Sequence, residues 1–173
     1  MELHSVLYYR HPQTEVMAQL DALWQSHEGD AAAIIAAAQD LNAEQGAELA
    51  QDLIDSVDEI EWDLRPDAVQ HAEGFSIVHF VHGSMGDENM ESIVAFVHDL
   101  LPGIQVQAWG CGDDDPWEYW FKYDGDELVR EDDEPFNDPE DDADIKASIY
   151  AWWHQDLPEQ IKVGFLNEET ETE

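Results

Sequence analysis

The sequence predicts an α+β protein with a mixed or antiparallel sheet of about four to five strands and helices packed mainly on one face. Apolar residues recur at helical spacing in several segments, and short runs rich in β-branched and aromatic residues lie between them. The 173 residues include 7 Trp, 5 Tyr and 6 Phe, enough aromatic area for a folded core. We expect residues 1–166 to form a single domain and residues 167–173 a disordered acidic tail.

The first third of the chain is predicted to form one strand and three helices, at residues 3–9, 14–28, 30–41 and 42–62. Residues 3–9 are mostly β-branched, aromatic or aliphatic, which favours a strand. Asp30 is the predicted N-cap of the alanine-rich second helix. Asn42, followed three residues later by Gln45, is a variant of the capping box, and the third helix after it carries one continuous apolar stripe.

The rest of the chain is predicted to form strands at residues 75–81, 104–109, 117–123 and 128–130 and a helix at residues 87–101. A last helix is predicted to begin at residues 138–139 or at residue 144 and to end near residue 157. Asp124 followed by Gly125 predicts a hairpin between the last two strands. Residues 110–116 are predicted as a turn, and the segment between the last strand and the last helix as an acidic loop. Helices packed against a sheet of this kind define an α+β domain.

The charge of the chain limits what it can bind. There are 42 Asp and Glu residues against 6 Lys and Arg, which gives a net charge of −36. Nucleic acids and anionic membranes are bound through clusters of Lys and Arg, so direct binding to either is excluded. The single cysteine excludes an internal disulfide framework. No signal peptide is apparent and no apolar run approaches the about 20 residues that span a bilayer, so a cytoplasmic protein is expected.

The sequence predicts neither catalysis nor a bound cofactor. It contains no glycine-rich phosphate loop, no Gly-x-Ser-x-Gly elbow, no His-Glu-x-x-His motif and no dinucleotide fingerprint. Phosphoryl transfer also needs cationic side chains to stabilise developing negative charge, and this chain has few.

No metal site is predicted either. His79 and His82 are three residues apart on a predicted strand, so their side chains point to opposite faces. Cys111 lies beside three aspartates, a setting that disfavours a reactive thiolate, and is interpreted as a turn residue. The acid-rich loops lack the spacing of an EF-hand.

The densest acidic segment predicts where a partner docks. Nine of the fourteen residues from 131 to 144 are acidic and none is basic. These acids are Glu131, Asp132, Asp133, Glu134, Asp138, Glu140, Asp141, Asp142 and Asp144. A structural alternative is a solvated loop whose later acids favour the start of the last helix.

Two further groups complete the predicted docking surface. Asp113, Asp114 and Asp115 form an accessory acidic patch. Trp152 and Trp153 are adjacent on a predicted helix and cannot both point inward, so at least one is expected to be partly exposed and to serve as a contact anchor.

Two hypotheses account for the charge. In the first, the chain is a non-catalytic inhibitor that sequesters a basic protein, such as a nucleic-acid-binding protein or a nuclease, in the manner of nucleic-acid mimics and acidic immunity proteins. In the second, the acidity is environmental, as in an ordinary cytoplasmic protein of a salt-loving organism. The net charge of unrelated proteins from the same cell would distinguish the two.

Overall fold

The computed structural model describes residues 3–26, 30–58, 64–82, 86–112, 118–133 and 139–158. In chain order the elements are β1 (Leu3–Arg10), α1 (Thr14–Ser26), α2 (Ala31–Leu41), α3 (Gly46–Asp58), β2 (Ala68–Ala72), β3 (Phe75–His82), α4 (Gly86–Leu100), β4 (Gln105–Gly112), β5 (Glu118–Asp124), β6 (Glu127–Asp133) and α5 (Pro139–His154). The predicted tail, residues 167–173, lies outside the described residues.

The strands form one antiparallel sheet in the order β2-β3-β1-β4-β5-β6. This confirms an α+β fold with an antiparallel sheet, but the sheet has six strands rather than four to five. The missed strand is β2, whose sequence Ala-Val-Gln-His-Ala contains a single strong β-former. It pairs only with β3. A tight turn joins these two strands, with positive φ angles at Glu73 (53°) and Gly74 (82°).

The chain follows a split βαβ path from β1 to β4, if the three helices α1 to α3 are taken as one crossover. Strands β1 and β2 are parallel to each other with β3 between them, and β3 and β4 are parallel with β1 between them. The β5–β6 hairpin and α5 extend this unit. Asp124 and Glu127 pair at the end of the hairpin, and Gly125 between them has a φ of 63°, as the predicted turn requires.

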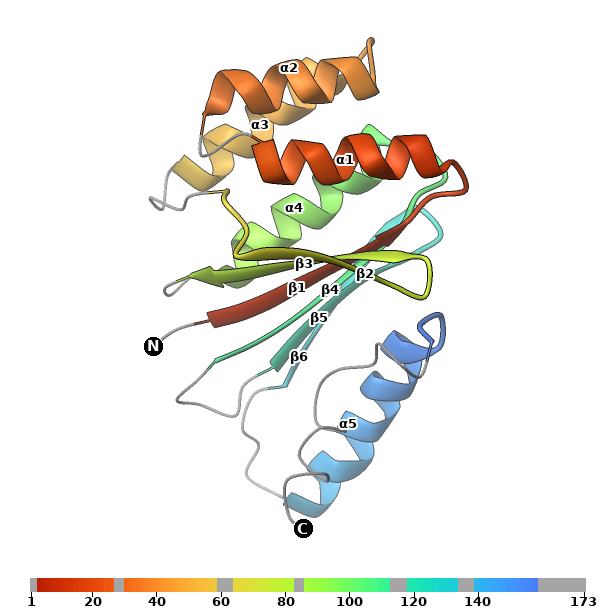
Figure 1. Cartoon of the computed structure of the whole chain (residues 1–173). Coiled ribbons are helices and arrows are strands. Elements are labelled where there is room, and N and C mark those ends of the chain that lie inside the picture. The colour runs from red at the N-terminus through yellow and green to blue at the C-terminus, as the bar shows by residue number, and fades with distance from the viewer. Residues whose placement is uncertain are drawn as a thin grey trace.

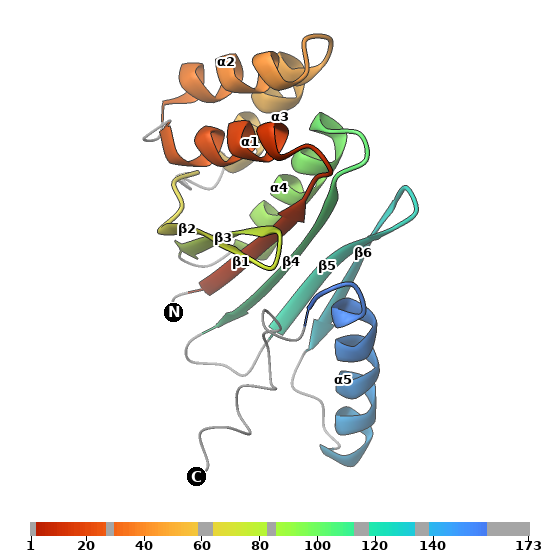
Figure 2. The same cartoon turned by 45° about the vertical axis from the view of Figure 1, so that its right-hand side comes forward.

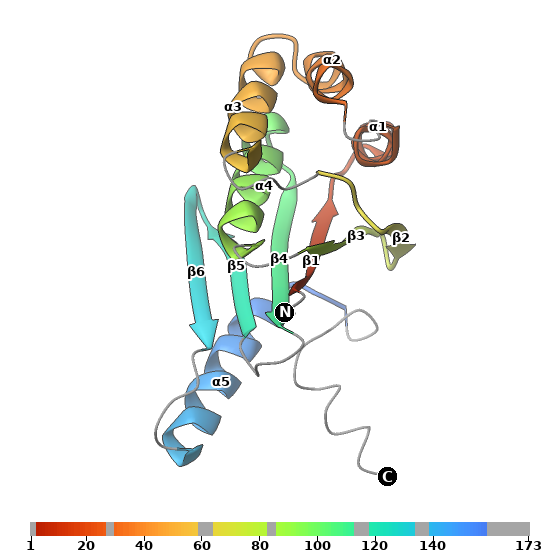
Figure 3. The same cartoon turned by 90° about the vertical axis from the view of Figure 1, so that its left-hand side faces the viewer.

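Helices cover both faces of the sheet (Figure 1). Helices α1 and α4 lie directly on one face, and α2 and α3 lie above them (Figures 1 and 2). Helix α5 lies on the opposite face (Figure 3). Four of the five helices in the described ranges therefore share one face, and the last helix adds a further layer.

Alternation along the strands divides the core in two. On β1, Leu7 and Tyr9 point into the large cluster beneath α1 and α4, whereas Val6 and Tyr8 point into a smaller cluster beneath α5. The smaller cluster also holds Trp120 of β5. Both faces of the central strands are thus buried, which explains why β1 and β5 read as nearly continuous apolar runs.

Asn42 both ends α2 and caps the turn that leads into α3, where the Gly46 N–H donates to its carbonyl at 2.8 Å. Its backbone N–H donates to the Ala38 carbonyl as the C-cap of α2. Its Oδ1 accepts from the N–H groups of Glu44 and Gln45, which form a turn, so α3 begins only at Gly46. The side-chain amide of Asn42 also donates to the Leu100 carbonyl at 3.0 Å and so ties this turn to the end of α4.

Gly46 lies where α2 and α3 cross most closely. A Cβ atom there would overlap the backbone of Ala38, which is fully buried. Only glycine fits between the two helices without moving one of them.

We predict that Gly46→Ala destabilises the protein by about 1–3 kcal/mol, the usual cost of forcing extra atoms into a packed site. Helix propensity alone predicts the opposite sign, a gain of up to about 1 kcal/mol. Urea unfolding followed by circular dichroism measures the difference. An unchanged or higher midpoint would show that α2 and α3 do not approach this closely.

Candidate docking surface

The acidic segment of residues 131–144 is mostly ordered secondary structure rather than a loop. Residues 131–133 are the end of β6, and residues 139–144 are the first turns of α5. Strand pairing accounts for the first part, since Asp132 lies opposite Tyr119 and Asp133 opposite Glu118. The second part is helical because Pro139 is favourable at the first helical position and acids favour a helix N-terminus. Glu134 and Asp138 lie outside the described residues.

The accessory patch, Asp113 to Asp115, also lies outside the described residues. The strand before it continues further than predicted: Cys111 is a residue of β4, paired with His4 and with Glu118, and not a turn residue. Glu118 in turn pairs with Asp133. The strand ends next to the two acidic segments are therefore cross-strand neighbours at one end of the sheet.

Strand β6 is an edge of the sheet and is held in place from one side by α4. Arg130 forms ion pairs with Asp87 at 2.6 Å and with Glu91 at 3.9 Å, and its guanidinium lies 5.4 Å from the centre of the Phe121 ring. Acids on an edge strand discourage pairing with another copy of the chain. The same edge can accept an extended basic segment as an additional strand.

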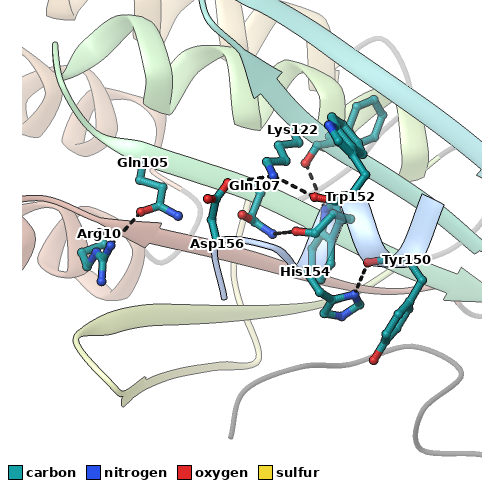
Figure 4. Close-up of polar contacts among 10 residues, drawn as sticks. Arg10, Gln105, Gln107, Lys122, Tyr150, Trp152, His154 and Asp156 are labelled. Carbon is teal, nitrogen blue, oxygen red and sulfur yellow. Dashed lines mark hydrogen bonds and ion pairs between the residues drawn. The ribbon is translucent and has the colours of Figure 1, made fainter. Parts of the chain in front are cut away.

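Helix α5 is fixed to the sheet at its C-terminal end (Figure 4). Lys122 of β5 donates to the Trp152 carbonyl at 2.9 Å and pairs with Asp156 at 2.7 Å. Gln107 of β4 donates to the Trp153 carbonyl at 2.9 Å. The last carbonyls of a helix have no partner within it, and a cation favours that end of the helix dipole. Side chains of the sheet thus cap α5.

The two adjacent tryptophans have different surroundings, as predicted. Trp153 is fully buried, stands edge-on to Tyr8, and donates from Nε1 to the carbonyls of Ala108 (3.1 Å) and Phe121 (3.3 Å). A partner cannot reach it, which removes Trp153 from the predicted contact anchors. Trp152 is only partly buried, with Lys122 Nζ 5.1 Å from its ring.

We call residues 131–133, the first turns of α5 (residues 139–144) and Trp152 the β6–α5 surface. In Figures 1 and 3 the first half of α5, in lighter blue, extends away from the sheet. Sequence reasoning missed Asp87 and Glu91, which bring further acids of α4 up to β6. Arg130 was the available signal, because an isolated base in an acidic strand needs carboxylate partners.

His79 and His82 are three positions apart on β3, and their backbone partners on β1 are Val6 and Leu3. Positions three apart on a strand belong to opposite faces of the sheet. Burial lowers the pKa of His79 below its usual 6.5, although nearby Asp67 partly offsets this effect. Within the described ranges no three His, Cys, Asp or Glu residues are grouped to hold a metal ion. None of the helices there is long and apolar enough to cross a membrane.

Comparison with protein-family models, with curated proteins and with solved structures found no match to the chain.

We predict that Lys122→Met destabilises the protein by about 1–3 kcal/mol, since it removes a charged hydrogen bond from the partly buried carbonyl of Trp152. Asp156→Asn should cost less than about 1 kcal/mol, because Asp156 is half-exposed and the bond from Lys122 to the helix remains. Chemical unfolding followed by tryptophan fluorescence compares the variants. Equal losses would mean that the ion pair, and not the helix cap, holds α5.

We further predict that His79 makes the fold less stable as the pH falls. The pKa of folded His79 is below 6.5, so below about pH 6.5 the unfolded chain binds a proton that the folded chain does not. The free energy of unfolding of the wild type, relative to His79→Gln, should therefore decrease as the pH is lowered through 6.5. Parallel unfolding series from pH 8 to pH 5 measure it, and a constant difference would contradict the assignment.

Proposed function

We propose that this protein is a non-catalytic acidic inhibitor that sequesters a basic partner, such as a nucleic-acid-binding protein or a nuclease. The observation that carries the proposal is the net charge of −36, together with the way the fold uses its few bases. Arg10 bonds Gln105 and lies over Phe75, Lys122 caps α5, and Arg130 holds β6 against α4. These three of the six Lys and Arg residues therefore make contacts within the fold.

The β6–α5 surface supports this role because its backbone belongs to two elements with defined contacts, an edge strand tied to α4 and a helix anchored by its last turn. Acids on an ordered backbone lose less ordering entropy on binding than acids on a loop. An array of carboxylates can occupy a groove built for phosphates, and its field speeds association with a cationic protein.

Environmental acidity is the competing explanation. The docking and environmental hypotheses differ in whether the positions of the acidic residues matter. A solvation role needs only total charge, so any set of surface acids is equivalent. A docking role makes particular carboxylates matter more than others of the same number.

We predict that replacing Asp132, Asp133, Asp141 and Asp142 by Asn slows association with the partner and weakens binding by about tenfold or more. The matched control replaces four exposed acids outside this surface, Glu15, Asp40, Glu73 and Asp126, by their amides. Both variants have the same net charge, so a specific docking surface gives a larger loss for the first set. Equal losses would mean that only the total charge matters.

The partner is identified by low-salt capture from the native cell and elution at high salt, followed by surface plasmon resonance. We expect the association rate to fall steeply as salt is added, and a DNA oligonucleotide to compete with this chain for the partner. Salt-insensitive binding, or binding of the isolated protein to DNA, would reject the proposal.

A further inference from the structure

Helices α3 and α4 lie side by side on the helical side of the molecule (Figures 1 and 3). A groove runs along their contact. Its floor is apolar, formed by Leu49, Leu53, Ala95 and Phe96, and it has a volume of about 240 Å³. It shares Leu49, Asp52 and Asp99 with a second hollow of about 370 Å³ that also includes Glu48. We call this combined feature the α3–α4 groove.

The rim of the groove is acidic, and neither α3 nor α4 places a Lys or Arg beside it. Glu48, Asp52 and Asp99 are exposed around the apolar floor. Helix α3 contains no Lys, Arg or His, and the base in the last turn of α4 is His98, which is stacked on Tyr123 and bonded to Asp99 at 2.9 Å.

Asp99 is placed where it does not help its own helix. It lies in the last turn of α4, where the helix dipole disfavours a negative charge. The helix dipole therefore does not account for an acid at this position, where the contact that Asp99 makes within α4 is its bond to His98.

We propose that the α3–α4 groove binds an amphipathic helix of the basic partner, one that carries Lys or Arg beside apolar side chains. The inference rests on the proposed function for the sign of the partner's charge and adds a second docking site away from the β6–α5 surface. Apolar side chains of the incoming helix cover Leu49 and Phe96, while cationic heads reach Asp52 and Asp99 on aliphatic stems.

Charge complementarity selects this occupant over the others. A second copy of the chain would bring another net charge of −36 against the same rim, and nucleic acids and anionic lipids are repelled in the same way. A helix is the form that suits the site, because a groove between two packed helices accepts the side-chain ridge of a third.

A defined peptide tests the groove without the native partner. The probe is a synthetic 14-residue peptide of Leu and Lys with leucines at helical spacing, and its control is a scrambled peptide of the same composition. Amide resonances of the ¹⁵N-labelled protein map the site, and fluorescence anisotropy gives the Kd. We expect the helical peptide to shift resonances along α3 and α4 and the scrambled peptide to bind more weakly there.

The matched variants each remove two negative charges. Asp52→Asn with Asp99→Asn should raise the Kd about fivefold, as expected for the loss of two surface ion pairs. Asp55→Asn with Glu73→Gln, exposed acids that do not line the groove, should change it less than twofold. Neutralising Asp99 removes an unfavourable helix charge, and circular dichroism checks that both variants are folded.

Three outcomes overturn the groove proposal: no binding of the helical peptide at low salt, shifts confined to β6 and α5, or equal weakening by the two variants. None of them decides the proposed function, which is tested separately by the four-acid variant of the β6–α5 surface and the native partner.

Discussion

The contact between Lys122 and the last carbonyls of α5 decides how the second half of this molecule is arranged. Lys122 is buried, and it is one of only 6 bases in a chain with 42 acids. Its bond to Trp152, with that of Gln107 to Trp153, positions the helix so that the Trp153 ring fills the smaller core beneath Tyr8. Without this cap, α5 would lose its anchor and β5 the cover over Trp120.

The buried carboxylates of Asp21 and Glu118 accept hydrogen bonds from side chains of neighbouring elements. Asp21 of α1 accepts from the hydroxyl of Tyr9, whose pKa is raised by burial and by this carboxylate, and it bonds His71 of β2 at 2.6 Å. Glu118 of β5 accepts from Trp109 Nε1 at 2.8 Å. Each of these buried acids links separate elements. The cost of burying charge is thereby offset, and the remaining repulsion is left at the surface, where water and salt screen it.

Helical periodicity and charge are local properties, and the features that depended on them alone were predicted well. The alanine-rich helix after Asp30 and the Asp124-Gly125 hairpin are where the pattern placed them. Strand β2 was missed because its sequence is a poor β-former and pairing with β3 is what orders it. The first part of the acidic segment was interpreted as a loop because its charge hid the continued pairing of β6, whereas Pro139 was one of the two starts considered for the last helix. The exposure of Trp152 and burial of Trp153 depend on which side of α5 meets the sheet, and no local pattern contains that information.

Helix α4 lies between the β6–α5 surface and the α3–α4 groove and contributes acids beside both. In its first half Asp87 and Glu91 face Arg130 of the edge strand, and in its last turn Asp99 lies at the rim of the α3–α4 groove. A helix of 15 residues is about 22 Å long, which is comparable to the width of a standard protein interface. Charge alone attracts any cationic protein. Discrimination among cationic proteins therefore requires complementary shape. An edge strand selects an extended segment and an apolar groove selects an amphipathic helix, so a partner that offers both at the right separation would be preferred over one with the same charge spread evenly.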